Sequence, residues 1–385
     1  MAEFGFYAYP WNLHEPAVEL ARMADMGMSH VTVAASYHAG KFLQPRDAHG
    51  RVYFPEDGTV YFRPARDYSR LKPQVARITE ERDILRDLCE RDDMPVRAWT
   101  VLNHNSRMGW QHPEVTARNA FGDSYPYSLC PANPDVQAYA VALCEDLAGY
   151  NLESLLLETP GWLTYAHGYH HEVAQLQSNA WLDGMLGLCF CRDCVAGAGR
   201  AGIDASGLRR RICERVDAFL ASDLILDAEA RIESDRADDP DLQAFLTWRC
   251  GVVTELCLTI RAAVRPDVQV KIISTCQRPH ATTYWEGGDL AELNRVSDGL
   301  ELPVYQPSAA LARHDLDHVI AQTGGASRLS VVLRPGFPDM TSAAQVKETV
   351  ASVLSAGIDD VSFYNYGMLP TINLGWLKSS LSTLS

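Results

Sequence analysis

A cluster of three cysteines is the feature of the sequence with the clearest chemistry. Cys189, Cys191 and Cys194 follow a C-x-C-x-x-C spacing, and three thiolates so close together can converge on one zinc ion. A tetrahedral structural site then needs a fourth ligand, and Cys130, in a polar loop upstream, is the best candidate. Free cysteines that fill a core seldom crowd in this way, and the pattern does not match a redox C-x-x-C at the start of a helix. We therefore expect these four cysteines to bind a structural Zn²⁺.

Glu158 is the single residue with the strongest catalytic signal. It ends the apolar run Leu155-Leu156-Leu157, so a buried strand delivers one carboxylate to the edge of a sheet. A carboxylate there can act as a nucleophile, a general base or an acid with a raised pKa. The competing interpretation is a structural salt bridge to an arginine such as Arg334.

A second carboxyl across the cleft is needed if the chemistry is glycoside hydrolysis. Asp339, a few residues after a later strand-like run, is our first choice. Glu301, inside another strand-like run, could equally be a buried and paired group. Glu286, in the segment Tyr284-Trp285-Glu286-Gly287, is a third option. The sequence alone leaves these alternatives open.

Aromatic rings and hydrogen-bonding side chains alternate where the expected strands end. Rings stack on the apolar faces of sugars, while Asn, Gln, Arg and His bond hydroxyl groups, so this composition favours a carbohydrate ligand. We expect Glu158 and Asp339 to be the catalytic pair. The expected substrate-binding residues are Trp11, Tyr37, His38, Asn103, His104, Trp162, His167, His170, Arg334, Tyr364 and Asn365.

A histidine-rich segment, His167-Gly168-Tyr169-His170-His171-Glu172, follows the strand that carries Glu158. Dense histidines suggest a catalytic metal, completed by Asp or Glu. The spacing does not match H-E-x-x-H, however, and adjacent side chains in an extended loop point in different directions. Contact with substrate is the favoured role for His167 and His170.

Strand-like and helical segments alternate along the whole chain. The expected strands are Phe4–Ala8, His30–Ala35, Val96–Leu102, Ser154–Leu157, Val268–Ser274, Gly299–Tyr305, Leu329–Leu333 and Asp360–Tyr364. Helical spacing covers His14–Met26, Val75–Arg91, Asn133–Leu147, Ser342–Ala356, Leu374–Leu384 and much of Leu208–Ala263, with an acidic break at Asp235–Asp241. Eight apolar strands separated by helices predict an α/β fold, a (β/α)8 TIM barrel. In such a barrel the chemistry lies at the carboxyl ends of the strands.

The chain is expected to form a single domain over residues 1–385, with long βα loops after strands 2, 3 and 4. The zinc-binding loop region would span residues 123–200, and a helical insertion would span residues 200–262. A chain of 385 residues is long enough for one large barrel.

Composition narrows the classes of partner. A net charge of −15 argues against nucleic acid and against anionic membranes. The first residues lack a basic region followed by a long apolar run, so we expect no signal peptide, and we expect no membrane span. Ten cysteines without a secretion signal indicate reduced thiols in a cytoplasmic protein. The oligomeric state is left open, although large apolar barrels often pair into homo-oligomers.

The cysteine pattern resembles that of the catalytic barrel of family 42 β-galactosidases and related glycoside hydrolase-like barrels. In that family a cysteine after strand three joins a C-x-C-x-x-C cluster after strand four around a structural zinc. Cys130 matches the first position, and Cys189, Cys191 and Cys194 match the cluster. The segment Leu129–Val136, which leads into a helix, also looks like the segment before strand four of many sugar-cleaving barrels.

Two departures separate the chain from this family. The family carries an Asn-Glu pair at strand four, where this chain has Leu157-Glu158, and a nucleophilic Glu at the end of strand seven, where it has Arg334. The resemblance thus implies the barrel and the zinc site more strongly than β-galactosidase activity. Other sugar-cleaving barrels place the nucleophile on strand four, a role that Glu158 could fill with Asp339 as the acid.

The sequence therefore predicts a glycoside hydrolase-like enzyme of carbohydrate metabolism. Two alternatives remain: a metal-dependent sugar lyase or isomerase that uses His and Glu ligands at the barrel mouth, and a non-catalytic carbohydrate-binding barrel that has lost one carboxylate.

Overall fold

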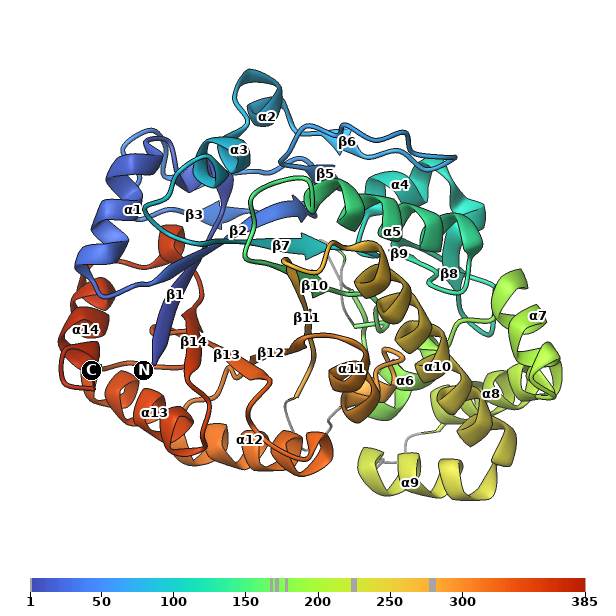
Figure 1. Cartoon of the computed structure of the whole chain (residues 1–385). Helices are drawn as coiled ribbons and strands as arrows, with labels where there is room; N and C mark the ends of the chain where they lie inside the picture. The colour runs from blue at the N-terminus through green and yellow to red at the C-terminus, as the bar shows by residue number, and fades with distance from the viewer. Residues whose placement is uncertain are drawn as a thin grey trace.

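Eight parallel strands close on themselves in a barrel (Figure 1), in a computed structural model that describes residues 2–166, 169, 173–176, 179–222, 227–276 and 282–384. The barrel strands are β1 (Glu3–Ala8), β2 (His30–Tyr37), β7 (Val96–Val101), β10 (Ser154–Glu158), β11 (Gln269–Ile273), β12 (Gly299–Pro303), β13 (Leu329–Leu333) and β14 (Asp360–Phe363). Each strand pairs in parallel with its neighbour, and β1 pairs with both β2 and β14 to complete the ring. The predicted (β/α)8 TIM barrel is confirmed, and each expected strand ends within two residues of an observed one.

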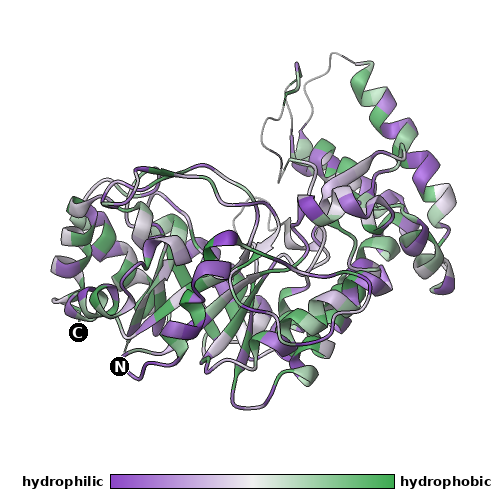
Figure 2. Cartoon of the chain, turned by 90° about the horizontal axis from the view of Figure 1, so that it is seen from above, coloured by the Kyte–Doolittle hydropathy of each residue, from purple (hydrophilic) through white to green (hydrophobic). Residues whose placement is uncertain are grey.

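The strands are apolar because both of their faces are covered. All residues of β2 and β7 are buried, as expected for parallel strands packed under helices on the outside and against each other inside. In Figure 2 the hydrophobic residues follow the strands and the inner sides of the surrounding helices.

Helices that follow the strands form the outer layer. They include α1 (Pro16–Asp25), α3 (Ile84–Cys89), α5 (Pro134–Leu147), α10 (Pro240–Ala263), α11 (Leu290–Val296), α12 (Ala309–Thr323), α13 (Ala343–Ser355) and α14 (Thr371–Leu381). Side chains cap several of them at the N-terminus: Asn133 accepts from backbone N–H groups of α5, and Ser342 accepts from Gln345 N of α13. Such caps stabilise helix ends by about 1 kcal/mol and explain where the predicted helices begin.

The prediction of one continuous helix over Val75–Arg91 is wrong. The segment forms α2 (Arg77–Glu81) and then α3, and Arg82 between them has extended backbone. The carboxylate of Asp83 accepts a hydrogen bond from Arg86 N, so it starts a second helix where the hydrophobic spacing suggests continuation.

The connections after β2, β7 and β10 are long. After β2 come β3 (Phe42–Leu43), β4 (Val52–Tyr53), β5 (Thr59–Val60) and β6 (Gln74–Val75), and after β7 come α4 (Ser106–Gln111), β8 (Thr116–Arg118) and β9 (Ser124–Leu129). Short 3-10 helices lie at Pro10–Asn12, Pro113–Val115, Thr282–Tyr284 and Tyr366–Met368.

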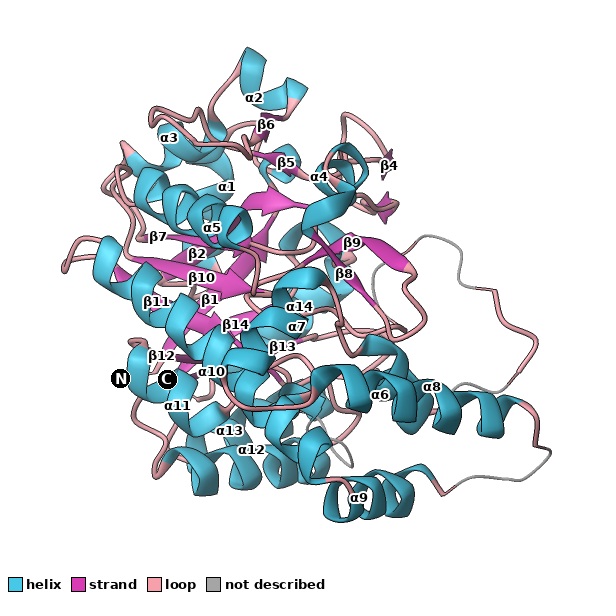
Figure 3. Cartoon of the chain, turned by 90° about the vertical axis from the view of Figure 1, so that its right-hand side faces the viewer, coloured by secondary structure: helices cyan, strands magenta, loops and turns pink. Residues whose placement is uncertain are grey.

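The connection from β10 to β11 holds a group of helices beside the barrel (Figures 1 and 3). They are α6 (Ala180–Gly187), α7 (Arg192–Arg200), α8 (Ala205–Leu220), α9 (Ala228–Asp238) and α10. The break predicted over Asp235–Asp241 is shorter in the structure: α9 continues through Asp235 to Asp238, and Asp239 alone separates it from α10. Its carboxylate caps α10 through Leu242 N and pairs with Arg211 and Arg215 of α8.

A polar layer fills the N-terminal end of the barrel interior. Arg97 Nη1 lies 2.9 Å from each carboxylate oxygen of Asp360, and Lys271 Nζ lies 2.8 Å from Asp360 Oδ2. Burial opposes ionisation, but these two cations hold the pKa of Asp360 below its usual value. Glu301 is fully buried just above and accepts hydrogen bonds from Ser330 Oγ and from Tyr7 OH. This end of the barrel is therefore a closed network of paired charges.

Among the described residues, no helix combines the length and the apolar character that a membrane span requires.

Candidate active site

A cavity of about 390 Å³ opens at the carboxyl ends of the barrel strands, a size typical of small-molecule sites. Rings, two carboxyl groups and one guanidinium contribute to its wall: Tyr7, Tyr37, Trp99, Glu158, Trp162, Glu286, Tyr305, Arg334 and Tyr364. In a TIM barrel this face carries the chemistry, so the cavity is the candidate active site.

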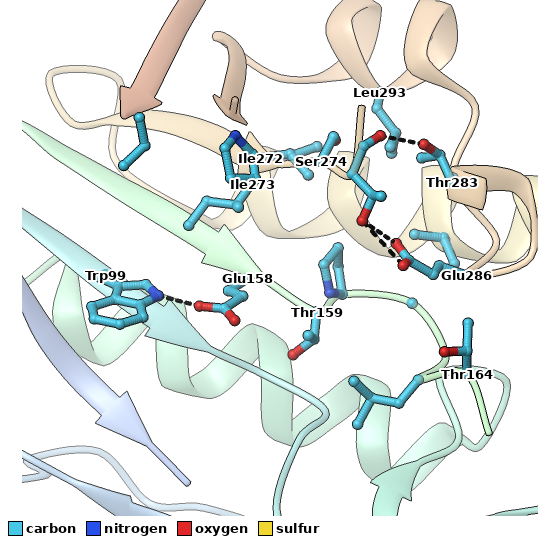
Figure 4. A pocket seen from close by; sticks show the side chains of 18 of the residues that line it. Trp99, Glu158, Thr159, Thr164, Ile272, Ile273, Ser274, Thr283, Glu286 and Leu293 are labelled. Carbon is cyan, nitrogen blue, oxygen red and sulfur yellow. Dashed lines mark hydrogen bonds between the residues drawn. The ribbon is translucent and has the colours of Figure 1, made fainter. Parts of the chain in front are cut away.

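Glu158 is the last residue of β10 and projects into this cavity (Figure 4). Its Oε2 accepts a hydrogen bond from the indole Nε1 of Trp99 on the neighbouring strand β7. Burial raises the pKa of Glu158 to about 7, and the Trp99 bond counteracts part of that rise. The next residue, Thr159, has φ of 53°. This value is unusual for a β-branched residue, and such backbone strain clusters at functional sites.

Glu286 supplies the second carboxyl of the cavity. It lies after β11, and Thr275 Oγ1 is 3.1 Å and 3.0 Å from its two carboxylate oxygens (Figure 4). Burial raises the pKa of Glu286 to about 7. The Thr275 hydroxyl lowers it somewhat, and the negative charges of Asp183 and Glu158 raise it further. Burial therefore raises the pKa of both carboxyls and favours their protonated forms.

Close packing ties together the loops that carry these carboxyls. Trp162 N donates to the carbonyl oxygen of Glu286 at 2.9 Å. A Cβ on Gly161 would lie 1.9 Å from that oxygen, and Gly287, at φ of 85°, faces the Trp162 ring in the same way. Glycine is required at both positions, and the loops after β10 and β11 are held against each other.

Asp339, our first choice for the second carboxyl, is engaged in an ion pair. Its oxygens lie 2.6 Å from Arg334 Nε and 2.9 Å from Arg334 Nη2. Arg334 lines the cavity, whereas Asp339 supports it from behind and is not among the described residues of the cavity wall. Glu301, the other alternative, belongs to the polar layer at the opposite end of the barrel. Of the three alternatives, Glu286 is the one that shares the cavity with Glu158.

Four of the predicted binding residues line the cavity: Tyr37, Trp162, Arg334 and Tyr364. The hydroxyl of Tyr9 links two of these rings, since it lies 3.0 Å from Tyr37 OH and 2.6 Å from Tyr364 OH. The Arg334 guanidinium lies 4.3 Å from the centre of the Tyr305 ring. The wall thus combines flat rings with hydroxyl and guanidinium donors.

The other described binding candidates are not part of the cavity wall. Trp11 stacks between Tyr9 and Tyr53, with ring centres 4.4 Å and 4.5 Å apart. His38 stacks at 4.1 Å on His104.

Two predicted asparagines support loops. Asn103 Nδ2 donates to the carbonyl of Pro160 at 2.7 Å and so holds the loop after Glu158. Asn365 Oδ1 accepts from Gly367 N at 3.1 Å. His167 and His170 lie outside the described residues.

Trp99, Tyr7 and Tyr305 belong to the wall but were not among the predicted site residues. Each lies on or just after a barrel strand, with its side chain turned toward the axis. The two-residue alternation of side chains along a strand could have identified Trp99 and Tyr7. Thr275, which binds Glu286, follows β11 in a segment with no comparable sequence signal.

The four predicted metal ligands converge in the fold. The Cys130 sulfur lies 3.4 Å from that of Cys194, 3.6 Å from that of Cys191 and 4.0 Å from that of Cys189. All four cysteines are buried, and the four sulfurs lie within 4.8 Å of one another. Zinc–sulfur bonds of about 2.3 Å in a tetrahedron put sulfurs about 3.8 Å apart, so the donor set fits one zinc ion.

Hydrogen bonds favour thiolate character at one cysteine of the cluster, Cys189. Arg118 N lies 3.3 Å from Cys189 Sγ. Burial raises the pKa of Cys130 and of Cys194. At Cys189 hydrogen bonds from the other three thiols outweigh burial and hold the pKa below its usual value. The cluster can hold a metal ion.

A second group of possible ligands, Glu3, His30 and Asp360, lies at the N-terminal end of the barrel. Asp360 is already bound there by Arg97 and Lys271, so this group belongs to the polar layer. Within the described ranges, no further group of histidines and carboxylates is close enough to bind a metal.

No protein-family model matches the chain, and no curated protein sequence matches it. Its fold is similar over the whole chain to α-L-fucosidase isoenzyme 2 from Paenibacillus thiaminolyticus, with a TM-score of 0.56 and 11% identity, and it spans 49% of that chain, about half. It is also similar to the catalytic domain of β-amylase from Paenibacillus polymyxa, with a TM-score of 0.58 and 12% identity, over 99% of this chain and 98% of that one. At such low identity the likeness concerns the fold alone: a TIM barrel like those of glycoside hydrolases.

Proposed function

We propose that the protein is a glycoside hydrolase in which Glu158 and Glu286 are the catalytic carboxyls. The observation that carries this proposal is that two carboxyls with pKa values raised to about 7 share one cavity at the catalytic face of a TIM barrel. Glycoside hydrolysis needs one protonated and one ionised carboxyl at the same time. Two coupled groups near neutral pH provide that state, because ionisation of one disfavours ionisation of the other.

Glu286 is the proton donor in this proposal. The negative charges of Asp183 and Glu158 raise the pKa of Glu286 and so favour its protonated form, whereas the Trp99 N–H favours the ionised form of Glu158. Glu286 then gives that proton to the glycosidic oxygen as the bond to the anomeric carbon breaks. The Glu158 carboxylate acts on the anomeric carbon or on the incoming water, which supplies the hydroxyl group and the proton that restores Glu286.

Rings and donors of the wall would bind the sugar. Trp162 and Tyr305 offer flat faces for stacking, and Arg334 and Tyr364 offer donors for hydroxyl groups. Asp339 is a positioning residue here, because its two hydrogen bonds fix the orientation of the Arg334 guanidinium.

The metal in the proposed enzyme is a structural Zn²⁺ held by Cys130, Cys189, Cys191 and Cys194. A site closed by four thiolates leaves no open position for substrate, so zinc would stabilise the fold rather than take part in hydrolysis. The convergence of the four sulfurs supports the resemblance to family 42 β-galactosidases in this feature. Membership of that family remains a proposal.

The test is hydrolysis of a panel of 4-nitrophenyl α- and β-glycosides and oligosaccharides by the wild type and by E158Q, E286Q and D339N. We expect E158Q and E286Q to lower kcat about 10²- to 10⁴-fold, the range for loss of an acid or base. D339N should act mainly on KM, because it loosens a binding residue. The matched control is E292Q, which changes an exposed glutamate paired with Arg295.

Two outcomes would contradict the proposal. If D339N abolished kcat while E286Q left it intact, Asp339 would be the acid and Glu286 a structural group. If the wild type bound sugars without cleaving any bond in the panel, the barrel would be a carbohydrate-binding protein.

A further inference from the structure

The cavity of the candidate active site has two unlike halves. Rings and polar groups surround Glu158. The indole of Trp99, which donates to the Glu158 carboxylate, has its ring centre 4.9 Å from that of Tyr37 and 5.3 Å from that of Tyr7. We call this part of the wall the ring half, and it consists of Tyr7, Tyr37, Trp99, Tyr305, Arg334 and Tyr364.

Aliphatic side chains lie around Glu286 instead. Val253 of α10 and Leu293 of α11 line the cavity and are buried. Both pack against the loop that carries Glu286: a Cβ on Gly287 would lie 2.8 Å from Val253 Cγ2, and a Cβ on Gly288 would lie 3.3 Å from Leu293 Cδ1. Figure 4 shows Leu293 and Glu286 on one side of the cavity, with Glu158 on the other. We call this part of the wall the aliphatic half.

Two hydroxyl groups near Glu286 are already used within the protein. Thr275 Oγ1 bonds the Glu286 carboxylate, and Thr283 Oγ1 donates to the carbonyl oxygen of Thr275. The methyl group of Thr283 faces Gly288, where a Cβ would lie 2.4 Å from it. A sugar in the described part of the aliphatic half would therefore leave buried hydroxyl groups without partners, which is unfavourable. An apolar group there would gain from burial.

The proposed reaction places one part of the substrate in each half. Glu158 acts at the anomeric carbon, so the sugar lies against the ring half. Glu286 gives its proton to the glycosidic oxygen as the bond from this oxygen to the anomeric carbon breaks. The oxygen then leaves as the hydroxyl group of a neutral alcohol, and water supplies the new hydroxyl group of the sugar and the proton that restores Glu286. The leaving alcohol therefore lies against the aliphatic half.

We propose that the substrates are glycosides whose leaving group is an apolar alcohol rather than a second sugar. The cavity volume of about 390 Å³ is near the lower limit of ligand sites, which suits one sugar with a compact leaving group. The chemistry in this proposal rests on the proposed function, whereas the apolar character of the aliphatic half does not.

The experiment uses alkyl glycosides from methyl to hexyl, made with the sugar and anomer that the wild type cleaves best. Disaccharides of the same sugar, with a second sugar as leaving group, are compared with them. We expect kcat/KM to rise about fourfold per methylene, the ratio that burial of one methylene provides, until the cavity is filled. The hexyl glycoside should also exceed the disaccharides.

V253T and L293N place polar groups of similar size in the aliphatic half. They should lower kcat/KM for the hexyl glycoside about tenfold more than for the methyl glycoside, because a polar group without a partner would face the alkyl chain. The matched control is V252T. Val252 is the adjacent residue on α10, is half-buried and is not part of this cavity wall, so V252T should match the wild type with both substrates.

A kcat/KM that does not change with chain length, or that is higher for a disaccharide than for the hexyl glycoside, would overturn the proposal. If V253T did not fold, L293N and the wild-type series would decide. If the wild type cleaved no glycoside, the proposed function would fail, and the aliphatic half would be tested by calorimetry with methyl and hexyl 1-thio-β-glucosides, which resist hydrolysis. Tighter binding of the hexyl compound would support the apolar site, and equal binding would contradict it.

Discussion

The indole N–H of Trp99 donates a hydrogen bond to the carboxylate of Glu158 from the adjacent barrel strand. This bond favours the ionised carboxyl, because a donor stabilises negative charge. In W99F the pKa of Glu158 should rise above its value of about 7. We expect the acidic limb of the profile of kcat/KM against pH to move to higher pH, and activity at pH 6 to fall more than activity at pH 8. A profile of W99F that superimposes on that of the wild type would show that the bond does not tune Glu158.

The two cavity carboxyls should make the fold less stable above neutral pH. Their pKa values of about 7 exceed the usual value of 4.5, so the folded protein binds protons that the unfolded chain releases. The stability that this proton binding contributes is fully present below about pH 4.5 and is lost as the pH rises through about 7. E158Q and E286Q should each raise the free energy of unfolding by about 1 to 3 kcal/mol at pH 8 and by less at pH 5. We lower the expected gain to this range because both side chains are only half-buried and solvent screens part of the effect. Denaturant unfolding at both pH values measures the effect, and equal gains at both would contradict the assignment.

The strands could be predicted from the sequence because each is an apolar run bounded by turns or helices. Leu329–Leu333 agrees in both bounds, and the other seven agree within two residues. Closure of the barrel follows from the count and alternation of elements. The predicted helix over Val75–Arg91 failed at Asp83, where a capping hydrogen bond overrides helical spacing.

The candidate site was harder to predict, because strand ends are visible in sequence while loop packing is not. Glu158 follows directly from its strand. Glu286 lies in the cavity because its loop packs closely against the loop after β10: Gly161 lies against the Glu286 carbonyl, and Gly287 lies against the Trp162 ring. These two loops are more than a hundred residues apart in the sequence. Asp339 seemed suitable by strand order, yet its pairing with Arg334 depends on the conformation of the loop between them.

Removal of one partner from the polar layer at the N-terminal end of the barrel should destabilise the fold. D360N would leave Arg97 and Lys271 buried without their shared carboxylate, and we expect a loss of about 3 to 5 kcal/mol in the free energy of unfolding. The matched control is D317N, which removes an exposed partner of Arg313 on α12 and should cost less than about 1 kcal/mol. Urea unfolding monitored by tryptophan fluorescence provides both values. Equal losses in the two variants would show that the layer does not brace the barrel.

The cysteine cluster should bind one zinc ion per chain, as a set of four thiolates does. C194S should lose most of that zinc and unfold at a lower temperature, because metal binding free energy contributes to folding. C213S is the control, since Cys213 is a free, half-buried cysteine of α8. Elemental analysis and thermal unfolding, with and without a chelator, measure both effects. A wild-type protein that carries no zinc after purification in zinc-supplemented medium would contradict the assignment.

The residues that stabilise the barrel and the residues proposed for function lie at different levels along its axis. The charged residues of the polar layer, Glu301 among them, lie below Tyr7, and the residues proposed to bind and cleave a ligand lie above it. The cavity wall could therefore be substituted to accept a different sugar, starting with Tyr305 and Arg334, without any change to the polar layer.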